Sequence, residues 1–201
     1  MQRNLIKKAL RYCLMLMALV IAGLFLWMQL GLYLITDSTQ RKMIVSEIKA
    51  APPVPENFIN VYSKVHPEEM NYSTYRCFFE RVSGNYIDSP CLAAAYMFYS
   101  TIRNANFFKW GTFAIYIDNN TTRKECIQFN MHRIDFTHNN IGVEAASQYY
   151  YRKPVANLSD YEILELLVMA KNPSLYNKNR INNQPFKNAY AVIKHKYESG
   201  S

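Results

Sequence analysis

Residues 142–177, GVEAASQYYYRKPVANLSDYEILELLVMAKNPSLYN, hold the signals that decide the fold of this chain. Ser159 and Glu162 have the spacing of a capping box, in which two side chains accept hydrogen bonds from backbone N–H groups at a helix N-terminus. A run of leucine and isoleucine follows and stops before Asn172-Pro173, because the residue before a proline is disfavoured in the helical region. The pattern predicts a buried helix that ends at Lys171.

Two further helix starts lie upstream of this stretch. Thr122 and Glu125 form a second capping-box pattern, followed by apolar residues on one helical face. Ser89, followed by proline, is a good N-cap for the nearly uncharged, and hence buried, run of residues 91–103. Only residues 112–117 resemble a strand, so the sequence predicts a mainly α fold.

Residues 13–35 have the composition of a membrane span, because they hold one polar side chain, Gln29, and no charge. At about 1.5 Å per residue this segment makes about 35 Å of helix, against a hydrocarbon core of about 30 Å. A cleaved signal peptide would need a shorter apolar core and a small-residue cleavage site, which residues 34–37 do not offer. We therefore expect an uncleaved, single-pass transmembrane anchor.

The charges on the two sides of this segment predict its orientation and exclude one class of ligand. Residues 1–12 form a basic tip that carries four of the chain's net charges of +8. By the positive-inside rule this tip is cytoplasmic. The remainder carries +4, with lysine and arginine spaced among acids rather than gathered on one face. This pattern does not favour nucleic acid as a partner.

A juxtamembrane stalk, residues 36–56, separates the anchor from a single domain of residues 57–201. The first part of the stalk, residues 36–51, is a short amphipathic stretch with basic side chains, and three prolines then interrupt it. The stretch is either a spacer or a surface helix whose basic side chains meet anionic headgroups.

Three cysteines lie beyond the predicted span, where a disulfide would be stable. The sequence leaves two alternatives open: a Cys77–Cys91 disulfide with Cys126 as a buried thiol, or three unpaired thiols. No Cys-x-x-Cys or His-Glu-x-x-His spacing occurs, and the four histidines share no helical face. We therefore expect neither a metal site nor a cofactor.

The stretch of residues 142–177 resembles, without a gap, the C-terminal conserved block of the family 51 peptidoglycan glycosyltransferases. In that block a G-[VI]-E-A-A-A run leads into Y-F-x-K-P-V, then L-[ST]-x-x-E, a helix rich in leucine and alanine, and P-S-x-Y-N. Residues 121–136, TTRKECIQFNMHRIDF, resemble the family's preceding helix, S-K-x-x-I-L-E-x-Y-L-N-x-x-x-F. The matching residues of the C-terminal block are Gly142, Glu144, Ala145, Ala146, Tyr150, Lys153, Pro154, Val155, Leu158, Ser159, Glu162, Pro173, Ser174, Tyr176 and Asn177.

The resemblance implies a lysozyme-like glycosyltransferase domain behind a single N-terminal transmembrane helix, in the bacterial inner membrane with the domain on the periplasmic side. It also implies catalytic acids that this sequence lacks. The family's general base belongs to an early Glu-Asp pair followed by Phe and His. In the corresponding region, residues 56–70, either residues 59–60 or residues 65–66 fall at the acids. Glu68 and Glu69 are nearby and are weak candidates for relocated catalytic acids.

The family's next motifs are also altered. The motif G-G-S-T-I-T-Q-Q corresponds to residues 89–96, where alanines stand near the glutamine positions. The Lys and Glu of R-K-x-x-E correspond to Phe107 and Trp110. General acid–base catalysis is typically worth about 10²–10⁴-fold, and apolar side chains cannot supply it. Both catalytic glutamate motifs are therefore lost. Polar positions of the following helix also differ, at Gln128, Asn130 and His132.

Two lysines retain positions that the family uses. Lys171 matches a lysine that many members place against the lipid-linked diphosphate, and Lys153 belongs to the retained Y-F-x-K-P-V pattern. The alternative for each is a solvated cation near a helix end. We expect Glu144 and Glu162 to be structural, and His132 to be a core or rim residue rather than a base.

We therefore interpret the chain as a membrane-anchored peptidoglycan glycosyltransferase-like protein of cell-envelope assembly. In this interpretation it is a pseudoenzyme that binds lipid-linked precursor or a cell-envelope protein. One alternative is a divergent active glycosyltransferase that uses Glu68 or Glu69. Another is a partner-binding module without lipid recognition.

Overall fold

The structure is a computed structural model that describes residues 2–35, 38–85, 87–98 and 106–200. These residues are mainly helical and contain no strand, only an isolated bridge between Asp135 and Ile141. The predicted mainly α fold is confirmed. The helices in chain order are α1 (Gln2–Ile35), α2 (Ser38–Lys49), α3 (Glu56–Val65), α4 (Pro67–Asn71), α5 (Thr74–Val82), α6 (Pro90–Met97), α7 (Phe107–Asn120), α8 (Arg123–Arg133), α9 (Val143–Tyr151), the 3₁₀ helix η2 (Val155–Asn157), α10 (Asp160–Lys171) and α11 (Gln184–Ser199).

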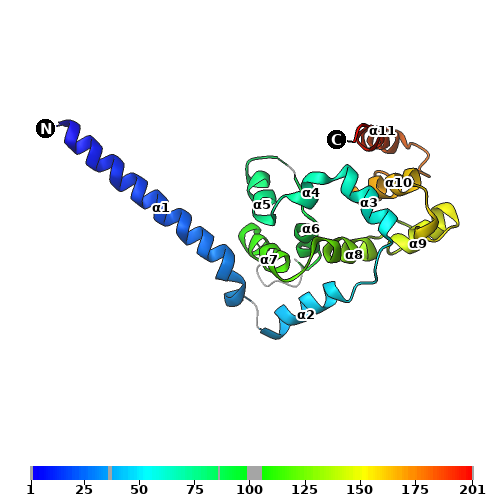
Figure 1. Cartoon of the computed structure of the whole chain (residues 1–201), viewed down its shortest axis with the longest axis horizontal. Helices are drawn as coiled ribbons and strands as arrows, with labels where there is room; N and C mark the ends of the chain where they lie inside the picture. Colours follow the sequence, from blue (N-terminus) through cyan, green and yellow to red (C-terminus); the bar gives the residue numbers. More distant parts are fainter. Residues whose placement is uncertain (1, 36–37, 86, 99–105, 201) are drawn as a thin grey trace.

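Helix α1 extends from the domain as a long rod, with its C-terminal end toward α7 and α2 (Figure 1). Among the described helices it alone is long and apolar enough to cross a membrane, over Leu5–Trp27. Side chains along this segment are exposed, whereas Gly31 is buried and Tyr33 packs edge-on against Tyr116 of α7, with ring centroids 6.0 Å apart. The apolar segment overlaps the predicted span of residues 13–35, whose limits stay a prediction.

Two hydrophobic clusters hold the domain together. The first lies among α3, α9, α10 and α11 and includes Leu164, and the second lies among α2, α5, α6 and α7 and includes Phe113. Helix α8 contributes to both, with Ile127 in the first cluster and Phe129 in the second. Full burial of one such side chain stabilises the fold by about 1.5–3 kcal/mol. Helix α8 therefore joins the two halves of the domain.

The three helix starts predicted from capping signals are confirmed. Ser89 accepts a hydrogen bond from a backbone N–H of α6 at 3.1 Å. The other two starts, at Thr122 and Ser159, form complete capping boxes. Helix α6 ends at Met97, earlier than the predicted limit, and residues 99–103 lie outside the described residues.

The predicted strand at residues 112–117 is wrong, because these residues lie within α7. Their β-branched side chains favour a strand locally. The segment is nevertheless helical, because Asn106 caps α7 by accepting from the N–H of Lys109 at 2.9 Å and because the helix packs against the second cluster. Gly111 permits this packing, since a Cβ there would overlap the ring of Phe78. Tertiary packing overrides local propensity here.

Both predicted cysteine arrangements are wrong, because a disulfide joins Cys91 of α6 to Cys126 of α8. Cys77 is a buried free thiol, and Cys13 is an exposed free thiol on α1. Helices α6 and α8 pack side by side, which brings together two cysteines separated by 35 residues. Such a contact between helices leaves no trace in the spacing of cysteines along the chain.

The amphipathic stretch of the stalk forms helix α2. Ile44 and Ile48 of this helix are buried in the second cluster, and Glu47 forms an ion pair with Arg133 of α8. Helix α2 is therefore packed on the domain rather than extended as a free spacer. Its contact with membrane headgroups stays a prediction.

Candidate functional site

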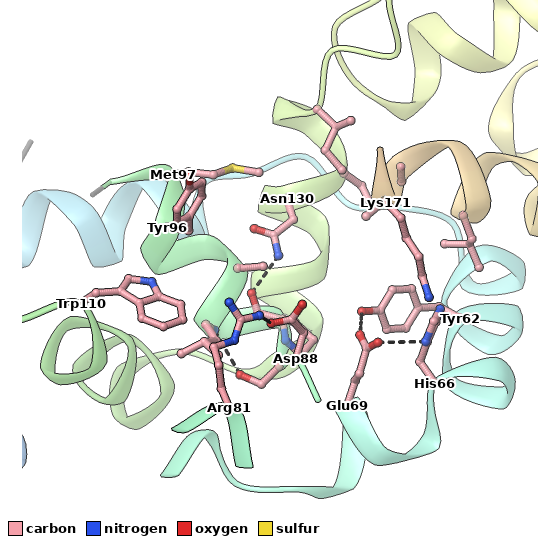
Figure 2. A pocket seen from close by; sticks show the side chains of 18 residues that line it. Tyr62, His66, Glu69, Arg81, Asp88, Tyr96, Met97, Trp110, Asn130 and Lys171 are labelled. Atoms are coloured by element: carbon pink, nitrogen blue, oxygen red, sulfur yellow. Dashed lines mark hydrogen bonds and ion pairs between the residues drawn. The ribbon is translucent and has the colours of Figure 1, made fainter. Parts of the chain in front are cut away.

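A pocket of about 550 Å³ lies where the two hydrophobic clusters meet (Figure 2). Met131 and Leu167 of the first cluster line it, as do Leu92 and Trp110 of the second. Because both clusters supply its walls, the pocket depends on how α8 joins them.

One half of the pocket is built around Glu69, and we call it the Glu69 side. It consists of Tyr62 and His66 at α3, Glu69 of α4, and Lys171 at the end of α10 (Figure 2). His66 ends α3 and also precedes α4, whose first residue is Pro67. Proline is favoured at a first helical position, so the chain turns here and starts a new helix. This turn directs Glu69 back toward Tyr62 and His66.

Both carboxylate oxygens of Glu69 accept hydrogen bonds. The Tyr62 hydroxyl donates to Oε2 at 2.5 Å, and Nδ1 of His66 lies 2.9 Å from Oε1. An ionised carboxylate only accepts, so we assign a hydrogen to this Nδ1 atom.

The same contacts control the protonation of Glu69. Burial alone would raise the pKa of Glu69, but hydrogen bonding and charge from His66, the Tyr62 hydroxyl and the positive charge of Lys171 together lower it. The pKa of Tyr62 is raised, first by burial and then by Glu69, so Tyr62 stays a donor. Glu69 is therefore an ionised acceptor at neutral pH, already occupied by two donors.

The other half of the pocket, which we call the Trp110 side, comes from α5 to α8. Arg81 and Asp88 form an ion pair there, and the Arg81 guanidinium carbon lies 5.2 Å from the centroid of the Trp110 ring. Desolvation raises the pKa of Asp88, and the charge of Arg81 opposes this rise. The ion pair carries no net charge. The remaining residues of the Trp110 side that Figure 2 labels are the uncharged Tyr96, Met97 and Asn130.

The two weak catalytic candidates lie in different places. Glu69 lines the pocket, whereas its neighbour Glu68 is exposed and outside the pocket lining. The family's Glu-Asp pair could be aligned with residues 59–60 or with residues 65–66. Of these two pairs only residues 65–66 reach the pocket, through His66. Residues 59–60 lie elsewhere, one in the core and one exposed.

The two candidate phosphate-binding lysines are also separated. Lys171 lines the pocket, and its side chain makes no ion pair or hydrogen bond with the residues that the structure describes. Lys153 lies outside the pocket lining, and its Nζ is 2.9 Å from Oε1 of Glu162. Only Lys171 is therefore placed to meet a ligand in the pocket.

The residues expected to be structural make structural contacts. Glu144 accepts from the N–H of Val155 at 3.3 Å. Glu162 completes the capping box of α10, and hydrogen bonding, first from Lys153, lowers its pKa. His132 lies 2.9 Å from the Pro52 carbonyl oxygen through Nε2, outside the pocket lining.

Sequence reasoning missed three residues of the pocket, namely Tyr62, Arg81 and Asp88. Tyr62, His66 and Glu69 are spaced by four and three positions, so this spacing along α3 and α4 was a signal that could have found Tyr62. Arg81 lies in the last turn of α5, and Asp88 lies near the end of the connection that leads to α6. No periodic pattern marks two residues that a connection brings together.

A comparison with protein families supplies an independent finding. The family model described as Transglycosylase matches residues 103–197, which contain Trp110, Asn130, Lys171 and the whole of residues 142–177. A search among curated proteins found no match to the chain. The matched part belongs to the transglycosylase family, the family 51 glycosyltransferases.

The fold and the family together define a class of protein. It is a mainly α protein with a transglycosylase domain behind one apolar N-terminal helix, and this domain suggests a peptidoglycan glycosyltransferase-like role. The family implies a lipid-linked peptidoglycan precursor as the class of substrate, and the apolar helix agrees with a membrane anchor.

Proposed function

We propose that this protein is a membrane-anchored pseudoenzyme of peptidoglycan assembly. It binds the lipid-linked disaccharide precursor through the diphosphate at Lys171 and does not polymerise it. One observation carries the proposal: the pocket retains Lys171, but Trp110 stands where the family's second catalytic glutamate is expected. The basic tip before the anchor supports an inner-membrane protein with a periplasmic domain.

Lys171 has the chemistry that a diphosphate requires. It is exposed, at the last position of α10, and its ammonium group offers three donors. Hydrogen bonds between a cation and a phosphate oxygen are about twice as strong as those between neutral groups. The neighbouring Glu69 is already held by Tyr62 and His66, so Lys171 is not needed to satisfy its oxygens.

The same pocket is poorly equipped for glycan polymerisation. A general base works best when its pKa lies near the operating pH. The pKa of Glu69 is lowered, and both of its oxygens already accept hydrogen bonds. Trp110 offers only an N–H donor, so it cannot replace a carboxylate.

A divergent active glycosyltransferase is the second candidate, and one observation favours it. Glu69 and Asp88 line the same pocket, with pKa values shifted in opposite directions, which is a pattern of paired catalytic acids and bases. The ion pair with Arg81 argues against Asp88 as an acid, because it stabilises the ionised form. The two candidates differ in one outcome, the formation of glycan chains.

The proposal is tested by the affinity of the full chain, in detergent micelles, for a fluorescent lipid-linked disaccharide. Lys171→Ala removes a charge-assisted contact worth about 1.5–3 kcal/mol, so we expect affinity to fall about 10–150-fold. Lys153→Ala is the matched control, since it removes an exposed lysine outside the pocket lining and should leave affinity unchanged.

Two results would contradict the proposal. Equal affinity of the two variants would show that Lys171 does not hold the diphosphate. Absence of binding by the wild-type protein would instead support a partner-binding module without lipid recognition.

A further inference from the structure

The net charge of the chain beyond the predicted span is concentrated at the C-terminal end. Residues 36–171 hold fourteen basic and fourteen acidic side chains, so they carry no net charge. Residues 172–201 hold five basic side chains and one acid, so the whole net charge of +4 belongs to them. Acids accompany the basic residues over most of the chain, but the segment that includes α11 is distinctly basic.

Ion pairs within the fold account for two of these five cations. Lys178 pairs with Glu165 of α10, and Nζ of Lys194 lies 3.7 Å from Oε1 of Glu198, the one acid of the segment. The other three make no ion pair with an acid among the residues that the structure describes. They are Arg180, Lys187 and Lys196.

Two of these three lysine and arginine side chains lie on α11, at the flanks of its solvent side. Phe186 and Ile193 are buried in the first cluster and hold the other side of the helix on the domain. Lys187 and Lys196 are nine positions apart, which at about 3.6 residues per turn places them at opposite flanks of the remaining surface. We call this surface the outer face of α11. Its members are Lys187, Asn188, Ala191, Val192, His195 and Lys196.

Helix α11 lies away from the predicted membrane anchor. Helix α1 packs against α7, whereas α11 packs mainly on α10 and α3. Figure 1 shows α11 on the opposite side of the domain from α7. This arrangement leaves the outer face of α11 open to a protein partner and does not favour a membrane surface as its occupant.

The charge of this end and one apolar side chain define the chemistry of the partner. Because residues 36–171 carry no net charge, the field of the domain steers an acidic partner toward its C-terminal end. Val192 is 66% exposed and lies between the two flanking lysines around the helix. An apolar centre with a charged rim is the usual anatomy of a protein interface, whereas a phosphate polymer would offer no apolar contact.

We propose that the outer face of α11 is a docking surface for an acidic segment of a partner protein. The carboxylates of that segment meet Lys187 and Lys196, and one of its apolar side chains covers Val192. This inference goes beyond the proposed function, because none of these three residues lines the pocket. It needs neither Lys171 nor a lipid-linked ligand.

Fluorescence anisotropy of two labelled peptides tests this surface, with the full chain in a neutral detergent at low ionic strength. One peptide repeats the triplet Glu-Glu-Leu, and the other repeats Gln-Gln-Leu over the same length, so the two differ only in charge. We expect the acidic peptide alone to bind. Its affinity should fall as salt is added, because salt screens exposed charges.

Two variants test the residues of the surface. Lys187→Glu combined with Lys196→Glu removes two surface ion pairs and adds repulsion of similar size, so we expect the affinity for the acidic peptide to fall at least about 4-fold. Val192→Ser removes the apolar contact and should lower this affinity about 5–30-fold. The matched control combines Lys42→Glu with Lys49→Glu. It changes the net charge equally at two exposed lysines of α2 and should keep an affinity close to that of wild type.

Three results with the peptides would overturn the inference. They are equal binding of the two peptides, no binding of the acidic peptide, and an equal loss in the α11 and α2 double variants, which would show an effect of net charge alone. An unchanged affinity in Val192→Ser would show that the surface attracts any polyanion, and it would equally contradict a protein interface.

Hydrogen exchange of the full chain in vesicles tests the membrane as the other occupant. We expect residues 184–199 to exchange equally in vesicles of phosphatidylcholine and in vesicles that also contain phosphatidylglycerol. Stronger protection with the anionic lipid would assign the outer face of α11 to the membrane and would overturn the inference.

The docking surface and the proposed function fail separately. The α11 double variant should bind the lipid-linked precursor as wild type does, because its two lysines lie outside the pocket lining. If the precursor binds through Lys171 but the acidic peptide does not bind, only the docking surface is wrong. If the peptide binds as expected but Lys171→Ala retains full precursor affinity, the diphosphate assignment fails instead.

Discussion

Replacement of Glu69 by glutamine tests the arrangement of the Glu69 side, because the change preserves size and removes charge. In the wild-type protein, both carboxylate oxygens accept, one from the Tyr62 hydroxyl and one from Nδ1 of His66. Glutamine has one oxygen, so it accepts from one of these donors while its amide N–H groups face the other. The variant therefore loses a hydrogen bond to a charged acceptor, and any contact that the neutral amide makes in its place is weaker.

The expected loss of stability follows from these contacts. A hydrogen bond to a charged group is worth about 1.5–3 kcal/mol. The Glu69 side chain is 20% exposed, so solvent screens the contact only in part. One kcal/mol shifts the Tm of a domain of this size by about 2–4 °C, so we expect Glu69→Gln to lower Tm by about 3–12 °C at neutral pH.

The loss depends on pH with a definite sign. The pKa of Glu69 is lowered in the folded protein from its ordinary value of 4.5. Its contribution to stability is therefore complete above that ordinary value and is lost as the pH falls through the folded pKa. The difference in Tm between wild type and Glu69→Gln should shrink in acid.

Thermal unfolding of the full chain in detergent, followed by circular dichroism at neutral and acidic pH, measures this difference. Glu68→Gln is the matched control, because Glu68 is the exposed neighbour outside the pocket lining. This control should stay within about 0.5 kcal/mol of wild type. Equal Tm values for the two variants at neutral pH, or a difference that grows in acid, would refute the reasoning.

Three further changes test the packing. Leu166→Asp places an unpaired carboxylate in the buried face of α10. The cost of several kcal/mol, against a total stability of about 5–15 kcal/mol, should unfold the domain. A melting curve like that of wild type would show that this helix is not buried. Replacement of Cys91 and Cys126 by alanine opens a 35-residue loop and should lower the free energy of unfolding by about 3–4 kcal/mol. A reductant should lower the Tm of the wild-type protein but not that of this double variant. Gly142 has φ +86° and ψ 157°, a region that only glycine adopts readily, and would place a Cβ 3.1 Å from a backbone carbonyl oxygen of α8. Gly142→Ala should therefore cost more than the backbone strain of about 1–3 kcal/mol alone. Gly84→Ala shares the positive φ without the crowding, so equal losses for the two glycine variants would contradict the close packing.

The predictable parts of this fold are those encoded by neighbouring residues. The caps at Ser89, Thr122 and Ser159 depend on residues within one helical turn, and all three start helices in the structure. The apolar N-terminal segment is likewise a matter of composition alone. The transglycosylase family was recognisable because residues 142–177 keep their motifs at fixed spacing.

The unpredictable parts depend on contacts between distant residues. The helical state of residues 112–117 is imposed by packing on the second cluster, and the Cys91–Cys126 disulfide by the pairing of α6 with α8. Local propensity and cysteine spacing carry no information on either contact.

The candidate site shows the same division. Lys171, which the family motif singled out, lines the pocket, and its contact with a diphosphate stays a prediction. Comparison with the motif also identified Trp110 as a departure, but not the unpaired state of its indole nitrogen, which depends on the surrounding packing. Arg81 and Asp88 were missed because only the folded connection between α5 and α6 brings them together.

The most direct test of the central claim is incubation of the wild-type protein, in vesicles, with lipid-linked disaccharide precursor, followed by separation of the products by size. An active family 51 glycosyltransferase under the same conditions serves as the positive control. Our account predicts that the precursor binds and that no product longer than the disaccharide forms. Glycan chains that form with wild type and disappear with Glu69→Gln or Asp88→Asn would contradict it and establish an active enzyme.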